Sequence, residues 1–399
     1  MASCSNILVV FLVLLWVFIA KADTTISLKK YGGIPGGKID STKALQKAWA
    51  DACAAEGKSQ IIIPHGDYLV GPVLFKGPCK GPVTIQLDGN LLADANLGHY
   101  KSNWLDFQYI DGLTFKGRGK LDGQGASAWP HNNCPKNWSC KLLPMTMSLS
   151  FVTNSSIRGI SSLNPKFFHV NLFSCRNLDL RWLTISAPGD SPNTDGIHVG
   201  GSSNIAISDS AISTGDDCIS LGSGTANVTV SGVTCGPGHG ISVGSLGKDA
   251  DKGDVVGLTV KNCTLTGTSN GIRIKSWKTK RGSRFWEMMK VEDFLFENVA
   301  MKNVANPIFI DQEYCPYAAC PESEPSRVKI NGVKFRNIRG TSSSDEVIKM
   351  VCSRRYPCEG VELRDIYLRY IGDDAQLKER ATCKNVKGTS SNVKPVSCF

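Results

Sequence analysis

Three aspartates and a histidine recur at a regular spacing in the middle of this 399-residue chain. Asp195 closes the segment NTD, Asp216 and Asp217 close GDD, and His239 is central in GHG. Inverting hydrolysis of a glycosidic bond needs one carboxylic acid to protonate the leaving oxygen and a carboxylate about 6.5–9.5 Å away to activate water. Clustered carboxylates also push their pKa values apart, which keeps one group protonated while others are ionised. These residue types therefore suit acid–base hydrolysis.

Two cations follow in the segment RIK, where Arg273 and Lys275 flank Ile274. Fixed positive charges of this kind can hold the carboxylate of a uronic acid. Each motif alone has an ordinary explanation: an Asp-Asp pair is usually a turn or a calcium-binding fragment, Gly-His-Gly a turn, and RIK a solvated strand face. Their occurrence at matching offsets in successive segments favours one shared site.

Short apolar strands recur with these motifs, each built around an isoleucine. They read GIHV at 196–199, CISL at 218–221, GISV at 240–243, GIRI at 271–274 and PIFI at 307–310. Their first isoleucines are separated by 22, 22, 31 and 36 residues. Repeats of this length with many Asn, Gly and Ser turns predict a parallel β-helix, in which each coil buries its apolar face against its neighbours.

A second segment alternates between apolar and polar residues, the period of a strand, on both sides of a turn-forming pair. Examples are LDLRWLTI from Leu178, VTVSGVTC from Val228, LTVKNCTL from Leu258, FLFENVAM from Phe294 and VELRDIYL from Val361. A β-sandwich is the alternative, but it needs antiparallel hairpins. Two-residue hairpin turns are scarce here, so the β-helix is favoured.

The open end of such a solenoid needs a cap. Residues 40–57 predict a helix with Asp40 or Ser41 as N-cap and a stop at Gly57. Leu45, Ala48, Trp49 and Ala52 would form its apolar stripe. We expect this helix to cover the N-terminal end of the β-helix.

Alignment of the isoleucines places Asp195, Asp217 and His239 on three successive coils, two residues before the isoleucine. Adjacent coils lie ~4.8 Å apart, so the three side chains would lie within about 10 Å. Strict alternation would turn the aspartates inward. We therefore expect a bend at the small residues that follow them, Gly196 and Cys218.

The first 22 residues have the pattern of a secretory signal peptide, with an apolar run at 7–19 and the site Ala20-Lys21-Ala22. A retained membrane anchor is disfavoured because the run is short. The prediction is a secreted, extracellular protein of the cell wall, without a membrane segment in its mature form, whose residues 23–399 form one catalytic β-helix domain.

Cysteines and glycosylation sequons fit that compartment. Of the 15 cysteines, Cys4 lies in the leader, and local disulfides are the expected use of the rest, with connectivity left open. The close pairs are Cys134/Cys140, Cys218/Cys235, Cys315/Cys320, Cys352/Cys358 and Cys383/Cys398. Paired C-x-x-C units are absent from the sequence, which disfavours a metal site. Sequons occur at Asn137, Asn154, Asn227 and Asn262.

The formal net charge is +10. A basic secreted protein could meet nucleic acid, an anionic membrane or an acidic polysaccharide. The sequence lacks a Lys/Arg block with interleaved aromatics, which disfavours nucleic acid. An acidic polysaccharide is the partner that composition favours.

The four motifs, NTD at 193–195, GDD at 215–217, GHG at 238–240 and RIK at 273–275, resemble the signature of the polygalacturonases, glycoside hydrolase family 28. Tyr314 in IDQEYC and the element from Asp122 to Trp129 extend the resemblance over essentially the whole mature chain. It implies a right-handed parallel β-helix that hydrolyses α-1,4-linked galacturonan with inversion, without a metal or other cofactor.

The resemblance also implies roles for single residues. Asp216 would be the general acid, Asp195 and Asp217 would activate the water, and His239 would tune the acid. Arg273 and Lys275 would bind the galacturonate carboxylate, with Asn193 and Tyr314 in contact with substrate. Cys218 and Cys235 would form a disulfide behind the site.

The stretch LDGQGASAWPHNNCPKNWSC is most similar to plant pollen-type exo-acting enzymes, so a monomeric exopolygalacturonase acting on pectin is expected. Four alternatives stay open: an endo-acting polygalacturonase, a calcium-dependent pectate lyase, a rhamnogalacturonan hydrolase, and a non-catalytic pectin-binding protein or allergen of the cell wall.

Overall fold

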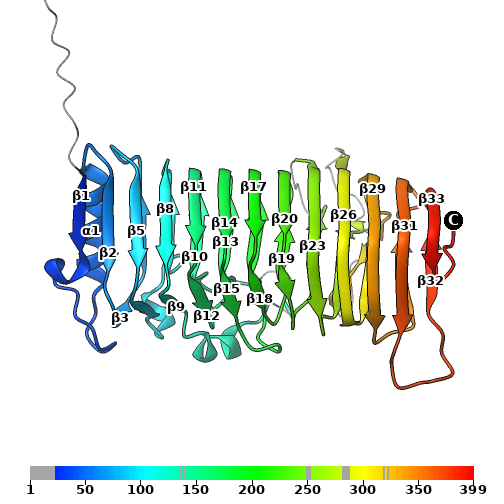
Figure 1. Ribbon diagram of the computed structural model, residues 1–399, viewed down its shortest axis with the longest axis horizontal. Coiled ribbons are helices and arrows are strands. Elements are labelled where there is room, and N and C mark those ends of the chain that lie inside the picture. The colour runs from blue at the N-terminus through cyan, green and yellow to red at the C-terminus, as the bar shows by residue number, and fades with distance from the viewer. Residues whose placement is uncertain are drawn as a thin grey trace, which may run out of the picture.

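The chain winds into coils that stack along a single axis (Figure 1). The structure, a computed structural model, describes residues 23–134, 136–137, 140–248, 253–280, 288–317, 320 and 323–399. The expected leader, residues 1–22, lies outside the described residues. The sequence-based prediction of a right-handed parallel β-helix with an N-terminal helical cap is confirmed.

One face of the solenoid is an 11-stranded parallel sheet, which we call the cleft sheet because the site lies on it. Its strands are β4 (Val73–Lys76), β7 (Leu105–Gln108), β10 (Met147–Ser150), β13 (Val170–Phe173), β16 (Ile197–Gly200), β19 (Ile219–Leu221), β22 (Ile241–Leu246), β24 (Asn270–Trp277), β27 (Asn306–Tyr314), β30 (Glu346–Val351) and β32 (Arg380–Lys384).

The remaining faces form a 20-stranded sheet in which consecutive coils pair in parallel. One column holds β1 (Thr24–Ser27), β2 (Ser59–Ile63), β5 (Val83–Leu87), β8 (Leu113–Gly117), β11 (Thr153–Arg158), β14 (Arg176–Arg181), β17 (Ser203–Ser208), β20 (Ala226–Ser231), β23 (Val255–Thr266), β26 (Met289–Val304), β29 (Val328–Ser342), β31 (Cys358–Tyr370) and β33 (Val386–Lys394). The other holds β3 (Asp67–Val70), β6 (Asn90–Ala93), β9 (Lys120–Asp122), β12 (Ser161–Leu163), β15 (Thr184–Ser186), β18 (Ala211–Ser213) and β21 (Thr234–Cys235).

Smaller elements lie outside the two sheets. They are an antiparallel pair, β25 (Thr279–Lys280) with β28 (Ser323–Glu324), and the 3₁₀ helices η1 (Leu28–Tyr31), η2 (Leu97–His99), η3 (Gly125–Ser127) and η4 (Trp129–His131).

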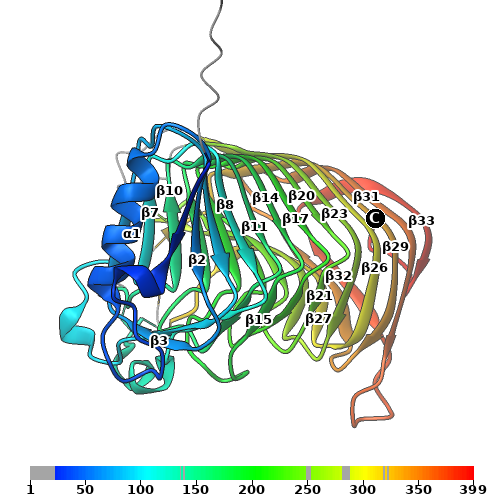
Figure 2. The same cartoon turned by 60° about the vertical axis from the view of Figure 1, so that its left-hand side comes forward.

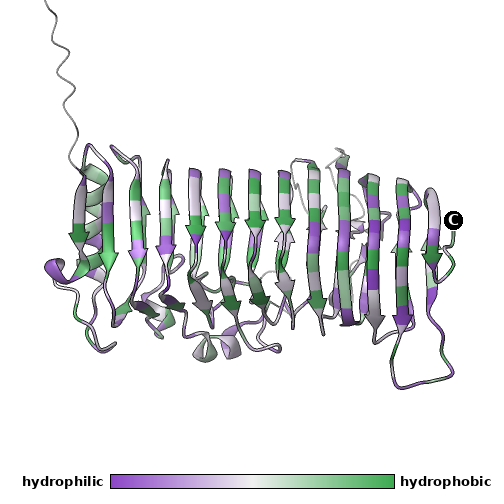
Figure 3. Ribbon diagram, in the orientation of Figure 1, coloured by the Kyte–Doolittle hydropathy of each residue, from purple (hydrophilic) through white to green (hydrophobic). Residues whose placement is uncertain are grey.

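The register of the cleft sheet follows the isoleucine alignment. The paired Cα atoms run from Ile197 to Ile219, Ile241, Ile272 and Ile308 on successive strands. All five side chains are buried, and each contributes about 1.5–3 kcal/mol by leaving water. Alternation of apolar and polar residues along the strands is visible in Figure 3. Stacked aliphatic side chains therefore fix the register, and the register places the polar residues.

The expected cap is α1 (Thr42–Ala54), which lies across the N-terminal end of the solenoid (Figure 2). Its apolar stripe is buried, and Trp49 packs edge-on against Phe75 of β4 with ring centroids 5.1 Å apart. Ser41 precedes the first turn without a side-chain cap, whereas Asp40 Oδ1 accepts the Thr42 N–H at 2.8 Å. The helix ends at Ala54 rather than before Gly57, because Ala55 is already extended.

Asparagines at positive φ form ladders along the outer turns. Asn177 Nδ2 donates to Asn154 Oδ1 at 2.9 Å, and Asn204 Nδ2 donates to Asn177 Oδ1 at 3.0 Å. The sequon residues Asn154, Asn227 and Asn262 belong to these turns and are exposed, and Asn137 is exposed between Cys134 and Cys140. Asparagine tolerates the left-handed region better than other non-glycine residues, which explains its recurrence.

Six disulfides are present among the described residues. Five join the close pairs named from the sequence; the sixth, Cys53–Cys79, was not predicted and ties the last turn of α1 to the segment after β4. Cys175 and Cys263 are unpaired and buried. An even cysteine count therefore does not imply complete pairing.

Candidate active site

The bend expected before the strands of the cleft sheet is present. Cys218 and Ile219 are adjacent, yet both are fully buried at 0% exposure, while Asp217 before them lines the cleft. Cys218 is held inside by its disulfide to Cys235 of β21. On the preceding coil, a Cβ on Gly196 would approach Ile212 Cγ2 to 2.6 Å. Two consecutive inward positions thus turn each aspartate outward.

A cleft with a volume of about 910 Å³ runs over these strands. Every residue that the sequence placed in the site lines it: Asn193, Asp195, Asp216, Asp217, His239, Arg273, Lys275 and Tyr314. Residues from five coils therefore meet in one open cavity.

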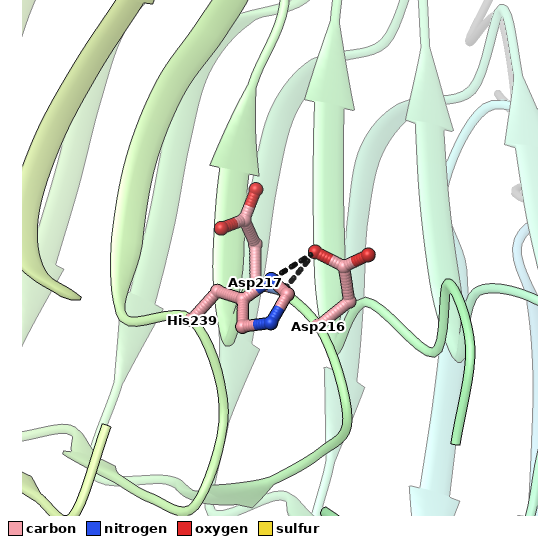
Figure 4. A group of neighbouring side chains, drawn as sticks. All are labelled: Asp216, Asp217 and His239. Atoms are coloured by element: carbon pink, nitrogen blue, oxygen red, sulfur yellow. Dashed lines mark hydrogen bonds and ion pairs between the residues drawn. The ribbon is translucent and has the colours of Figure 1, made fainter. Parts of the chain in front are cut away.

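Asp216 forms a pair with His239 (Figure 4). His239 Nδ1 lies 2.9 Å from Asp216 Oδ1, which also accepts the Asp217 N–H at 2.8 Å. The backbone joins the same two residues, because the His239 N–H donates to the Asp216 carbonyl at 2.7 Å. The Asp216 side chain keeps 19% of its surface exposed, so it is accessible from the cleft. This is the geometry of a proton-transfer pair.

Asp217 is locked as an anion. Its side chain is 2% exposed and receives hydrogen bonds from Arg273 Nη2 and Lys275 Nζ, both at 2.9 Å, and from Ser242 Oγ at 2.6 Å. Burial alone would raise its pKa, but the charges of Lys275 and Arg273 outweigh it and lower the pKa to about 2. Figure 4 shows the Asp217 carboxylate pointing away from the Asp216–His239 pair.

Asp195 behaves in the opposite way. It is 6% exposed, and Ser220 Oγ donates to its Oδ2 at 2.8 Å. Burial and the nearby charges of Asp216 and Asp217 raise its pKa well above the usual value, against a lowering by Lys275. The cluster therefore separates the proton affinities of two neighbouring carboxylates, and such groups titrate as a unit.

Arg273 and Lys275 have a second task that the sequence did not show. Both bond Asp217, yet both also line the cleft and retain further N–H donors for a ligand. Lys275 Nζ lies 5.5 Å from the ring centroid of Tyr314, which packs edge-on against Trp277. The Lys275 ammonium group is thus positioned by the Asp217 carboxylate and by the ring of Tyr314.

Asn193 connects Asp216 to a loop. Its Nδ2 lies 3.3 Å from Asp216 Oδ2, and its Oδ1 accepts from Asn132 Nδ2 at 3.1 Å. The turn that carries Asp216 is tight, because a Cβ on Gly215 would meet the Ser191 carbonyl at 2.0 Å. Glycine is therefore required at position 215.

Asp216, Asp217 and His239 each offer a ligand atom, and these atoms lie within 4.8 Å of one another. The Asp216 and Asp217 oxygens are therefore closer together than the separation of about 6.5–9.5 Å expected from the sequence for an inverting pair, so inversion is implied by the family resemblance and not by this distance. Two features argue against a divalent cation there. The Asp217 oxygens already bond Arg273 and Lys275, and these two positive charges would repel a metal ion.

Sequence reasoning missed the residues that position the aspartates: Ser220, Ser242, His198 and Asn132. The first three share one register column with Arg273, one residue after each aligned isoleucine. Their bonds run between coils, from Ser220 to Asp195 and from Ser242 to Asp217. The alignment of the isoleucines already placed these residues in one column. The hydrogen bonds to the aspartates could not be predicted, because they form only when the bend turns the aspartates toward the column.

Comparison with known proteins agrees with this geometry. The family model described as "Glycosyl hydrolases family 28" matches residues 53–398. The chain belongs to glycosyl hydrolase family 28. It is therefore a glycoside hydrolase, and the sequence-based assignment is confirmed.

Relatives of family 28 match most of the chain. An exopolygalacturonase from Zea mays is 46% identical over 93% of this chain and 90% of its own length. A polygalacturonase from Gossypium hirsutum is 42% identical over 100% of this chain and 97% of its own. Among solved structures, an exopolygalacturonase from Thermotoga maritima superposes with a TM-score of 0.74 at 15% identity, covering 92% of this chain and 91% of that one. At this identity the structural match supports the fold.

Proposed function

We propose that this family 28 enzyme is a secreted polygalacturonase that hydrolyses α-1,4-galacturonosyl linkages of pectin with inversion, releasing units from a chain end. The observation that carries the proposal is the cleft in which the accessible Asp216–His239 pair lies beside the buried Asp217 and its two cations. Relatives called polygalacturonase and exopolygalacturonase support it.

The proposed reaction divides its two tasks, protonation of the leaving oxygen and activation of water, among the three aspartates. Asp216 gives its proton to the glycosidic oxygen as that bond breaks, with His239 assisting. Ionised Asp195 and Asp217 orient the water that attacks the anomeric carbon from the opposite face. Asp195 takes its proton, because the charges of Lys275 and Arg273 hold the pKa of Asp217 low. Arg273 and Lys275 hold the galacturonate carboxylate, which gives the enzyme its preference for an acidic sugar.

The first test measures reducing ends released from polygalacturonate. Asp216→Asn should lower the rate by about 10²–10⁴-fold, because it removes the general acid, and should leave binding largely intact. Arg273→Ala should weaken binding. Asp209→Asn is a matched control, since Asp209 is an exposed turn residue outside the cleft. Absence of activity in the wild type, with equal binding by Asp216→Asn, would support a non-catalytic pectin-binding protein instead.

Product analysis tests the exo mode. Digestion of a defined oligogalacturonate should give monomer alone at early times, whereas a ladder of oligomers would show endo action. An unsaturated product, or inhibition by a chelator, would point to lyase chemistry. Hydrolysis of rhamnogalacturonan in preference to polygalacturonate would indicate the rhamnogalacturonan hydrolase alternative.

Export and glycosylation belong to the same proposal. The apolar run at 7–19 would direct secretion to the cell wall, and the four exposed sequon asparagines are accessible to a glycosyltransferase. Within the described part of the chain, no helix has the length and apolar composition to cross a membrane. Protein from the medium should begin near residue 23, migrate as a monomer, and lose mass on treatment with an N-glycosidase.

A further inference from the structure

His198 is a histidine of the cleft for which the proposed reaction has no task. It lies on β16 one residue after Ile197, pairs in register with Ser220, and lines the cleft with Asp195 and Asp217. Its ring packs against Phe168 with centroids 5.3 Å apart. Burial lowers its pKa to about 4, so the imidazole is neutral in the range where the enzyme can use an ionised Asp195.

Hydrogen bonding assigns the proton on this neutral ring. Ser220 Oγ lies 2.8 Å from Asp195 Oδ2 and also 2.8 Å from His198 Nδ1. Serine has a single hydroxyl proton, and an ionised carboxylate can only accept. Ser220 therefore donates to Asp195 in the state in which Asp195 acts as base, and its oxygen must accept from His198 Nδ1–H. The remaining nitrogen, Nε2, is then a bare acceptor.

The space around Nε2 is kept open by two glycines. A Cβ on Gly200 or on Gly222 would lie 3.5 Å from Nε2, an ordinary contact distance, and neither glycine has a positive φ. The fold would accept alanine at either position. Gly222 also lines the cleft, and among the described residues no group hydrogen-bonds Nε2. The acceptor is thus left facing a cavity large enough for a ligand group.

The next serine of the column, Ser242, has a neighbour of the opposite polarity, which comes from the following coil and not from the preceding one. Ser242 bonds Asp217 at 2.6 Å and is held by Arg273 Nε at 3.2 Å, so the group beside this serine is a pure donor. Arg273 suits a ligand carboxylate. A bare imidazole nitrogen instead repels a carboxylate and attracts a hydroxyl, because only the hydroxyl carries a proton to donate.

We propose that His198 Nε2 accepts a hydrogen bond from a hydroxyl of the sugar ring bound beside Asp195, and that Ser220 positions it by fixing the tautomer. His198 is thereby a substrate-binding residue that reads the hydroxyl side of the ring while Arg273 and Lys275 read its carboxylate. This inference rests on the proposed function and extends it to the orientation of the substrate.

Steady-state kinetics on a short oligogalacturonate test the contact. His198→Ala should raise KM about 5–10-fold, the value of one hydrogen bond, with a smaller change in kcat. Gly222→Ala should raise KM similarly without a change in melting temperature, because its methyl group fills the approach to Nε2. Asn171→Ala is the matched control: Asn171 pairs with His198 one strand earlier but lies outside the cleft, so its KM should stay at the wild-type value.

Nitrogen-15 NMR of the histidine rings provides a readout that does not depend on the variants' activity. In the wild type at neutral pH, Nδ1 of His198 should be protonated and Nε2 unprotonated, and Ser220→Ala should abolish this preference. A protonated Nε2 in the wild type, or an unchanged KM in both His198→Ala and Gly222→Ala, would overturn the inference while leaving the hydrolase activity in place. A wild type without activity on any galacturonan would instead remove the proposed function itself.

Discussion

At the scale of single residues, the site is a set of carboxylates with different surroundings. Asp217 is buried against two cations, Asp195 is buried against one hydroxyl and two like charges, and Asp216 is accessible beside His239. The three aspartates share a residue type but not an environment, and the environment moves the pKa values of Asp195 and Asp217 in opposite directions.

The raised pKa of Asp195 predicts where activity is lost at low pH. Because Asp195 must be ionised to take a proton and its pKa is raised, kcat/KM should begin to rise at a pH above 3.8, the ordinary value for aspartate. Lys275→Met removes a charge that lowers the pKa of Asp195, so the limb should move to higher pH. Lys349→Met, at a lysine outside the cleft, is the control. A shift of the acid limb to lower pH in Lys275→Met would contradict the assignment of Asp195 as the base.

At the scale of elements, the sequence predicted the strands and their register well, because stacked isoleucines such as Ile219 and Ile241 leave one workable alignment. The same alignment predicted that Asp195, Asp217 and His239 lie together with Arg273 and Lys275, as the cleft shows. Asn193 and Tyr314 were expected only from the family resemblance. It could not predict bonds between coils, such as Ser220 to Asp195, since these depend on a bend whose direction comes from the burial of Cys218. Nor could it pair Cys53 with Cys79, which are 26 residues apart with three strands between them.

Removal of the disulfide that tethers α1 should destabilise the protein more than removal of a disulfide that closes a short loop. Removal of Cys53–Cys79, which closes 26 residues, should lower the free energy of unfolding by about 3.5 kcal/mol. Removal of Cys134–Cys140, which closes 6, should cost about 2 kcal/mol. Calorimetry on the two double alanine variants should show the lower melting temperature for the variant without Cys53–Cys79. The reverse order would mean that α1 stays packed on the solenoid without this disulfide.

At the scale of the whole molecule, the solenoid offers one long face to a long polymer. The cleft sheet runs the length of the stack (Figure 1), and the net charge of +10 favours association with a polyanion. The stack also explains why the site needs so few loops: adjacent coils bring residues tens of positions apart to within a strand spacing.

Ionic strength should therefore act on binding more than on chemistry. KM for polygalacturonate should rise as salt is increased from about 20 to 300 mM, since the Debye length shortens over this range, while kcat changes little. The same series on the methyl-esterified polymer, which carries less charge, is the control and should respond less. A KM independent of salt would show that the overall charge has no part in substrate capture.

The stereochemistry of the first product tests the central claim most directly. Proton NMR recorded during hydrolysis of an α-1,4-linked trigalacturonate reports the anomer that forms before mutarotation. We predict β-galacturonic acid first, because Asp216 protonates the leaving oxygen while Asp195 and Asp217 direct water to the opposite face. An α-anomer formed first would indicate retention, and an unsaturated product would indicate elimination; either result would contradict the account.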